Sequence, residues 1–358
     1  MGKLLMLDIG AGTMDVLYYD EESGLHYKAV AKSPVLYLAE KAQSLQGDLL
    51  ITGCEMGGGP ISQVLKHRAQ EAEVIMSISS AATIHHSLGK VRSLGIKVIE
   101  DTEADKLRRN KRYRHLAIGD LEADRLKHII KGFGVPFEFD VVGICAQDHG
   151  VAPADVSHLD YRHNTFKISL DENPFPHALI YATDSVPSTF NRLRSIAKNA
   201  RVLPADEVYV MDSGMAAILG ASMDVLVRSK ERVLVLDVAT SHTLGASLEG
   251  EELCGFFEYH THDITLEKLE TLLVDLADGE LKHKQILKEG GHGAYVRKAI
   301  GYRNVEIIVA AGPKRSLVEN SRLPIVLGAP FGDNMMTGTV GLLEAIRRFK
   351  GLKPIRYL

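Results

Sequence analysis

Apolar positions along this chain follow two patterns that alternate from beginning to end. Continuous apolar runs of four to ten residues predict buried strands, at 3–8, 49–53, 137–146, 232–238 and 305–313. Apolar residues at helical spacing predict amphipathic helices between such runs, at 121–133, 188–198, 265–278 and 336–349. Two stretches fit neither pattern. The Pro- and His-bearing stretch 151–177 predicts irregular structure, and the charged stretch 100–115 predicts a solvated surface. The pattern as a whole indicates an α/β protein.

The first apolar run ends in a short turn of small residues. Asp8 closes the run, the turn is Gly10-Ala11-Gly12-Thr13, and a second, loosely alternating run returns from Met14. We interpret this as a β-hairpin, whose glycines permit positive φ and let a ligand approach the backbone. Consecutive N–H groups at such a tip bind anions, and the Thr13 hydroxyl adds a donor. Asp8, where strand meets turn, is suited to holding a divalent cation through water.

The same arrangement occurs a second time. The run 7–19 and the run 234–248 each have a strand that ends in aspartate, a turn of small residues with threonine, and a returning strand. Each is followed by further strands and helices and later by a helix of small residues. Two similar halves with facing hairpin tips predict a clamp for one polyphosphate, with Asp237 as the carboxylate that faces Asp8.

Composition narrows the class of protein. The 358 residues suffice for two domains, and a net charge of −4 gives no indication of a nucleic-acid partner. No apolar run reaches the roughly 20 residues of a membrane span. Cys54, Cys145 and Cys254 are far apart and form no disulfide framework, so we expect a cytoplasmic protein without nucleic-acid or membrane partners.

Five regions, in order, resemble the superfamily of actin, sugar and acetate kinases and heat-shock chaperone ATPases. They are the two phosphate motifs Asp8–Asp15 and Asp237–Thr243, the connecting helices 212–220 and 337–343, and an adenosine motif at 307–316. The resemblance implies a two-domain actin-like fold, of the duplicated ribonuclease H type, with an interdomain cleft. It implies an N-terminal domain 1–211, on which helix 336–350 packs back, and a C-terminal domain 212–358.

The resemblance also implies ligands and site residues. ATP and Mg²⁺ are the expected cofactors, with Asp8 and Asp237 at the metal and Asp212 positioning metal and attacking water. The residues expected to contact nucleotide are Gly10, Ala11, Gly12, Thr13, Asp237, Thr240, Ser241, Gly312 and Pro313. One motif departs from the superfamily pattern, because Ala239, Thr240 and Ser241 stand where consecutive glycines are usual. Side chains there would crowd a phosphate.

Within the superfamily, four pieces resemble a little-characterised prokaryotic family labelled "putative pyruvate-formate-lyase activating enzyme". They are 146–150, 242–244, 258–261 and 291–294. Such activases are radical enzymes that need a Cys-x-x-x-Cys-x-x-Cys cluster site. No two cysteines of this chain are near each other, so one loop cannot supply three cluster ligands. We therefore keep the family and expect no radical activase chemistry.

Asp148 follows the strand 137–146, at the edge where open α/β sheets bind ligands. It is a candidate general base for a substrate hydroxyl, with Gln147 and His149 flanking that substrate. A turn stabilised by Asp148 is the alternative interpretation.

Histidines gather at predicted strand ends and loops. His149, His242, His260 and His292, with Glu258, form a candidate site for Zn²⁺ or another transition metal, or for substrate. Alternation along the strand would also place His262 on the face of His260. Ordinary solvated or hydrogen-bonded histidines are the alternative.

Three functions remain open. The first is an ATPase or a phosphotransferase that uses Mg-ATP on a small molecule of unknown identity. The second is a non-catalytic protein of actin type, which would include a homo-oligomer. The third is a metal- or small-molecule-binding member that has lost ATP turnover through its altered second phosphate motif.

Overall fold

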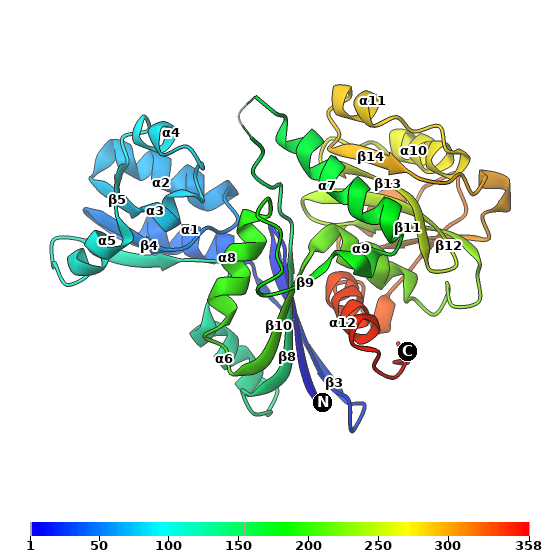
Figure 1. The fold of residues 1–358 in the computed structure, drawn as a ribbon, viewed down its shortest axis with the longest axis horizontal. Helices are drawn as coiled ribbons and strands as arrows, with labels where there is room; N and C mark the ends of the chain where they lie inside the picture. Colours follow the sequence, from blue (N-terminus) through cyan, green and yellow to red (C-terminus); the bar gives the residue numbers. More distant parts are fainter. Residues whose placement is uncertain (1, 154, 358) are drawn as a thin grey trace.

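The computed structural model describes residues 2–153 and 155–357 and contains two large sheets that share the order of five strands, with β9 added at the parallel edge of the first and β14 at the meander edge of the second (Figure 1). The first runs β3-β2-β1-β8-β10-β9, with β1 Lys3–Ile9, β2 Thr13–Asp20, β3 His26–Lys32, β8 Phe139–Ala146, β9 Ile180–Ala182 and β10 Ala205–Asp212. The second runs β14-β13-β12-β11-β15-β16, with β11 Arg232–Val238, β12 His242–Glu249, β13 Glu252–His260, β14 Gly293–Val296, β15 Ile307–Ala311 and β16 Ile325–Leu327.

Strand directions repeat as well. In each sheet three strands form an antiparallel meander, β1-β2-β3 and β11-β12-β13. The first strand of each meander then pairs in parallel with a later strand, β1 with β8 and β11 with β15, and a further parallel strand follows. This duplicated order confirms the predicted α/β class and the two-lobed actin-like fold. The central parallel strands β1, β8, β11 and β15 are buried on both faces over most of their length, which explains their continuous apolar runs.

Two helices lie between the large sheets, α9 (Ser213–Ser222) and α12 (Thr337–Lys350) (Figure 1). Helix α9 packs on β11 and β12 of the second sheet, α12 packs on β1 and β8 of the first, and the two helices pack against each other. Their contact is at backbone distance, because a Cβ atom at Gly220 would collide with the Thr337 carbonyl and one at Gly341 with the Ala216 carbonyl. The small residues noted in the sequence therefore allow the helices that join the lobes to touch.

A third sheet is inserted between β3 and β8. Its four strands are all parallel, in the order β6-β5-β4-β7, with β4 Leu49–Gly53, β5 Val74–Ser77, β6 Lys97–Ile99 and β7 Arg114–Ile118. Its helices are α1 Pro34–Ser44, α2 Gly59–Glu71, α3 Ile78–Ala81, α4 Leu88–Arg92 and α5 Asp101–Leu107. The expectation of a merely solvated face at 100–115 was incomplete, because α5 covers β4 and β5 there and β7 begins at Arg114.

The remaining helices cover the two large sheets. They are α6 Ala123–Gly132, α7 His158–Glu172, α8 Asn191–Ala200, α10 Leu266–Asp278 and α11 His283–Lys288. The expectation of irregular structure at 151–177 was wrong over α7, which Ser157 caps by accepting the Asp160 N–H. Helix α7 precedes β10 in the chain yet packs on β14 of the second sheet. Within the described ranges, no helix is both long enough and apolar enough to span a bilayer.

Candidate functional site

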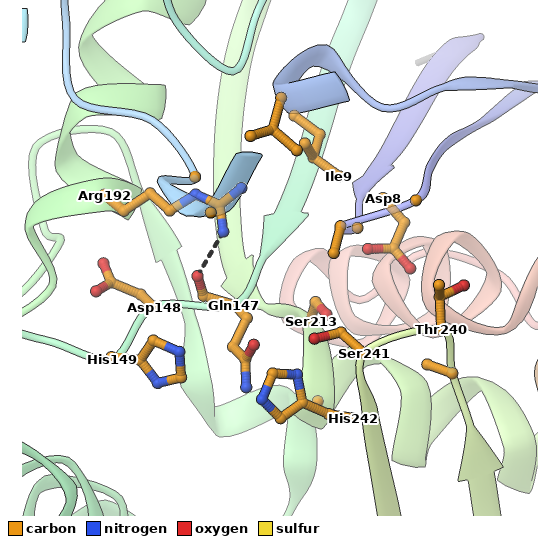
Figure 2. A pocket seen from close by; sticks show the side chains of 18 of the residues that line it. Asp8, Ile9, Gln147, Asp148, His149, Arg192, Ser213, Thr240, Ser241 and His242 are labelled. Atoms are coloured by element: carbon orange, nitrogen blue, oxygen red, sulfur yellow. Dashed lines mark hydrogen bonds between the residues drawn. The ribbon is translucent and has the colours of Figure 1, made fainter. Parts of the chain in front are cut away.

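The two hairpin tips, β1–β2 and β11–β12, open into one cavity of about 600 Å³. The first sheet contributes the ends of β1 and β8, the second sheet contributes the ends of β11, β12 and β13, and the inserted sheet contributes 55–60 and 82–86. In Figure 2, Asp8 and Thr240 lie on one side of this space, and Gln147, His149 and His242 lie together on the other. Parallel strands deliver their carboxyl ends here, which is where open α/β sheets bind ligands.

The two tips are built from the same turn. In the first, the Gly10 N–H donates to the Thr13 carbonyl at 3.0 Å; in the second, the Ala239 N–H donates to the His242 carbonyl at 3.0 Å. In each tip the donor lies two residues, and the acceptor five residues, after the aspartate, Asp8 or Asp237. The equivalence makes His242 the counterpart of Thr13.

The tips also touch. A Cβ atom at Gly12 would lie 3.1 Å from Thr240 Cγ2, so the Thr240 side chain lies against the backbone of the opposite tip. In the altered second phosphate motif, where we expect side chains to crowd a phosphate, Thr240 thus contacts the first tip directly.

Three carboxylates, Asp8, Asp15 and Asp237, gather at the base of the tips. Strand register places Asp8 directly opposite Asp15, where like charges repel. Burial, with repulsion from Asp8, raises the pKa of Asp15 to about 8 and that of Asp237 to about 7. Burial also raises the pKa of Asp8 to about 6. Oδ1 of Asp8 and Oδ1 of Asp15 are buried without a hydrogen-bond partner among the described residues.

This donor set fits a hard divalent cation. Carboxylate oxygens are the ligands that Mg²⁺ prefers, and a cation would favour their charged forms. The N-terminus of α12 closes the floor, since a Cβ atom at Gly338 would collide with the Asp8 carboxylate. Asp8 and Asp237, predicted at the metal, therefore lie together, and Asp15 joins them.

Gly312 and Pro313 line the cavity beyond the second tip. Gly312 has φ +90°, and a Cβ atom there would lie 2.6 Å from the Val238 carbonyl and 2.7 Å from Asp237 Oδ1. Only glycine fits this close approach. Asn334 donates its amide to the Gly312 carbonyl at 3.1 Å. The predicted adenosine motif thus lies beside the carboxylates.

Asp148 and Asp212, the predicted catalytic carboxylates, are both buried and both hydrogen-bonded to backbone. Asp148 accepts the N–H groups of Gly150 at 2.8 Å and Leu193 at 2.9 Å, which caps α8. Burial nevertheless raises the pKa of Asp148 to about 6. Asp212 caps α9, where its Oδ1 accepts the Gly214 N–H at 3.0 Å. Asp148 lines the cavity and Asp212 lies behind it. Their catalytic roles stay predictions.

A buried arginine in the cavity wall links the two lobes. Arg162 of α7 donates to Asp212 at 2.9 Å and to Glu258 of β13 at 2.8 Å. Burial alone would raise the pKa of Glu258, but the Arg162 guanidinium holds it well below its usual range. Gln147, from the end of β8, also donates to Glu258. Glu258 is therefore an ionised carboxylate that accepts hydrogen bonds from Arg162 and Gln147.

The four predicted histidines do come together. Ring centroids of His149 lie 6.0 Å from His242 and 5.6 Å from His292, and those of His242 and His260 are 4.5 Å apart. His262 lies in the turn that follows β13 and is 75% exposed, and its ring centroid is 5.2 Å from that of His260. The two rings are therefore neighbours as expected, although the strand ends before His262 and strand alternation is not the reason.

Sequence reasoning missed two cations and a carboxylate. Arg162 fell in the stretch taken as irregular. Arg192, from α8, donates to Asp120 at 2.8 Å and to the Gln147 carbonyl at 2.8 Å, which fixes the loop after β8 (Figure 2). Asp15 stood in the quoted motif, and its position opposite Asp8 in a two-stranded ladder was the available signal.

The three cysteines are free and lie on separate elements. Cys145 is in β8 of the first sheet, Cys254 is in β13 of the second, and Cys54 follows β4 of the inserted sheet. This arrangement offers no site at which three thiolates would hold an iron–sulfur cluster.

Three of the solved structures that resemble this chain share 10–12% sequence identity with it. Lmo2764 from Listeria monocytogenes, titled a "putative N-acetylmannosamine kinase", has 11% identity and a TM-score of 0.36, over 97% of this chain and 99% of that one. MreB5 of Spiroplasma citri bound to ADP has 12% and 0.36, over 98% of each. Ethanolamine utilization protein EutJ from Carboxydothermus hydrogenoformans has 10% and 0.32, over 96% and 89%.

No curated protein matches this sequence. A family model matches residues 56–317, most of the chain, from the inserted sheet through the adenosine motif. The chain belongs to the family described as "Putative pyruvate format-lyase activating enzyme (DUF1786)".

Proposed function

We propose that this protein binds a Mg²⁺–nucleotide in the cavity between its lobes and transfers the terminal phosphoryl group to water or to a small molecule. One observation carries the proposal: two hairpin tips with the same hydrogen-bonded turn face each other above three carboxylates, of which Asp15 and Asp237 are buried. We further propose that the lobes divide at residues 211 and 212, where β10 gives way to α9.

Backbone N–H groups of the tip after Gly10, whose own N–H closes the turn, and the Thr13 hydroxyl would bind phosphate oxygens from one side. Thr240 and Ser241 would bind them from the other, and Gly312 and Pro313 would contact the base. Asp8 and Asp237 would hold the magnesium ion, directly or through water, and Asp15 would support them. Magnesium supplies charge neutralisation on the transferring phosphoryl group.

Asp148 is the group we assign to the acceptor. Its pKa of about 6 suits a general base near neutral pH. Both of its oxygens hold backbone N–H groups, so taking a proton requires one of these bonds to be exchanged. Gln147 and His149 flank the space in front of it and would orient the acceptor (Figure 2). Asp212 would act only indirectly, through α9 and Arg162.

Binding without turnover is the second candidate, favoured by the contact of Thr240 with Gly12. A phosphate between the tips must move that side chain aside or open the lobes. Thr240→Gly tests whether this contact limits phosphate binding, and phosphate release then separates turnover from binding alone. If crowding limits binding, this variant binds Mg-ATP more tightly than the wild type; if the tips bind no phosphate, its affinity does not change.

Calorimetric titration of Mg-ATP and Mg-ADP tests binding, with Asp237→Asn as the variant. Asp184→Asn is a matched control, since the Asp184 side chain is 89% exposed and pairs with Arg201 at the surface. We expect saturable binding that Asp237→Asn weakens at least tenfold and the control leaves unchanged. Phosphate release with and without Asp148→Asn then tests turnover. Absence of binding at millimolar Mg-ATP would overturn the nucleotide proposal.

A further inference from the structure

Three imidazoles meet at one corner of the second sheet, at the ends of three neighbouring strands. His242 begins β12 and His260 ends β13, and the two are direct partners in the antiparallel ladder. His292 immediately precedes β14, and its N–H donates to the Glu258 carbonyl at 2.8 Å. All three backbones are held by the sheet, so the rings are mounted on rigid structure.

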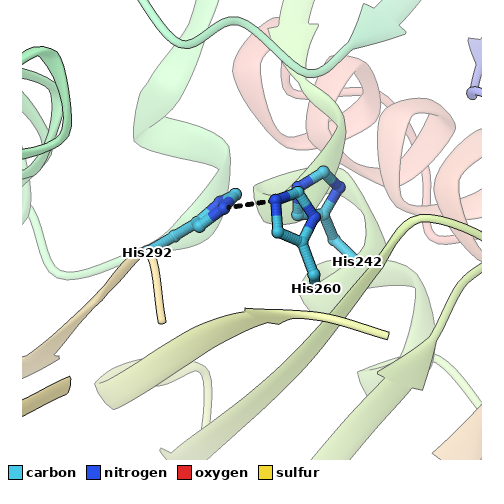
Figure 3. A group of neighbouring side chains, drawn as sticks. All are labelled: His242, His260 and His292. Carbon is cyan, nitrogen blue, oxygen red and sulfur yellow. Dashed lines mark hydrogen bonds between the residues drawn. The ribbon is translucent and has the colours of Figure 1, made fainter. Parts of the chain in front are cut away.

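Their nitrogens converge on a common point (Figure 3). One ring nitrogen from each histidine lies within 4.8 Å of the others, and Nε2 of His292 is 3.1 Å from Nε2 of His260. A tetrahedral zinc ion with bonds of about 2.0–2.1 Å separates its ligand nitrogens by about 3.3 Å. Small rotations of the rings therefore suffice to place the three nitrogens around one ion.

One of these nitrogens lacks any partner. Nε2 of His242 is buried and accepts or donates no hydrogen bond within the part of the chain that the structure describes. A buried polar atom left unpaired destabilises the fold unless something binds it. The neighbouring ring nitrogens of His260 and His292 point into the same space, which is the arrangement that a shared cation would satisfy.

A carboxylate stands behind the cluster and orients one ring. Oε1 of Glu258 lies 3.3 Å from Nδ1 of His292, on the side of that ring away from His260. A carboxylate oxygen beside Nδ1 favours the tautomer in which Nδ1 of His292 donates its hydrogen to Glu258, which leaves a lone pair on Nε2. Histidines that ligate metals commonly donate their second nitrogen to a carboxylate in this way.

We propose that His242, His260 and His292 bind one divalent transition-metal ion, with Zn²⁺ as the probe, and leave a coordination position open to the cavity. His242 and His260 line that cavity, and three protein ligands with an open position are typical of catalytic rather than structural zinc. The open position would take water or an oxygen atom of a small anionic or hydroxylated ligand. His149 and Gln147, at the end of β8, face it from the other lobe. This metal site does not depend on nucleotide binding.

The test uses the full chain, freed of metal with EDTA and titrated with ZnCl₂ by calorimetry and with CoCl₂ by absorption. His260→Ala and His292→Ala remove single ligands. His262→Ala is the matched control, since that exposed histidine neighbours His260 but is not one of the three whose nitrogens converge. Circular dichroism confirms that each variant is folded.

We expect one equivalent of Zn²⁺ in the wild type and in His262→Ala, together with the visible bands of tetrahedral Co²⁺. Both ligand variants should lose at least about 100-fold in affinity and lose the Co²⁺ bands. Glu258→Gln should weaken binding by about 10–100-fold without abolishing it, as expected for a residue that orients a ligand. No stoichiometric metal in the wild type, or equal affinity in all variants, would overturn the proposal. Asp237→Asn should keep its zinc, so failure of the nucleotide site and failure of this site are distinguishable.

Discussion

Replacing Arg162 with methionine tests the assignment of the buried network that joins the lobes. The side chain is 6% exposed and lies between Asp212 and Glu258, each 3% exposed. Methionine has a similar length and no charge. The substitution therefore leaves two buried carboxylates without their shared cation while keeping most of the packing volume.

The expected cost follows from the contacts. Breaking a buried ion pair by removing one partner destabilises a protein by about 3–5 kcal/mol, because an uncompensated buried charge remains. Both carboxylates keep other donors, since Asp212 retains the Gly214 N–H and Glu258 retains Gln147. We therefore expect the lower part of that range. Arg112→Met is the matched control, because Arg112 also bridges two carboxylates but its side chain is 59% exposed, where water screens such pairs.

Urea unfolding at pH 7.5 in EDTA, followed by circular dichroism and by tyrosine fluorescence, measures the difference. The chain has twelve tyrosines and no tryptophan. Adding Glu258→Gln to Arg162→Met should recover part of the lost stability, since it removes one of the stranded charges. Equal losses in Arg162→Met and Arg112→Met, or no recovery in the double variant, would refute the reasoning.

Three further outcomes are expected. Gly341→Ala should lower the free energy of unfolding by about 1–3 kcal/mol, because its Cβ collides with α9; Gly132→Ala, whose Cβ meets open space in α6, should raise it by about 0.5–1 kcal/mol in the same urea assay. The carboxylates Asp8, Asp15 and Asp237 have raised pKa values in the folded state, so their protonation stabilises the fold. That stabilisation is complete below the ordinary carboxyl pKa of 3.8 and is lost as pH rises through about 6 to 8. The urea midpoint in EDTA should therefore fall between pH 4 and pH 9. The fall should be smaller in Asp15→Asn. Added Mg²⁺ should raise the urea midpoint most at high pH. A wild-type midpoint independent of both pH and Mg²⁺ would contradict the assignment of Asp8, Asp15 and Asp237 to a cation site.

Much of the fold was predictable because its defining feature is local. A buried strand that ends in aspartate, a turn of small residues and a returning strand lie within about a dozen residues, and the second copy at Asp237 fixes the internal symmetry. The helix 336–350 and the strand 305–313 were equally readable, since each is a long apolar pattern with clear ends, and the structure shortens the strand to Ile307–Ala311.

The rest depends on contacts between distant segments. Helix α7 has Arg162, Phe166 and Leu170 on its buried face, so a charged residue stands where a periodic pattern expects an apolar one. Only the carboxylates of Asp212 and Glu258, 50 and 96 positions away, explain that arginine. In the inserted sheet the apolar run 49–53 predicted β4, whereas β6, with three residues, is too short to show a period.

The second phosphate motif lacks the usual glycines, and the same turn contributes a histidine to the cluster. In this structure the two features are one change. The turn bond of Ala239 with His242 repeats that of Gly10 with Thr13, so the position that offers a hydroxyl in the first tip offers an imidazole in the second. That imidazole pairs across the ladder with His260 and has an unpartnered buried nitrogen. The side chains that narrow the space for a polyphosphate thus stand beside a group suited to a transition metal. A protein whose first tip binds an anion and whose second tip binds a metal ion would differ in this way at equivalent positions of its two halves. The metal content of the purified protein and its affinity for Mg-ATP, measured on the same sample, decide whether both chemistries operate in this cavity.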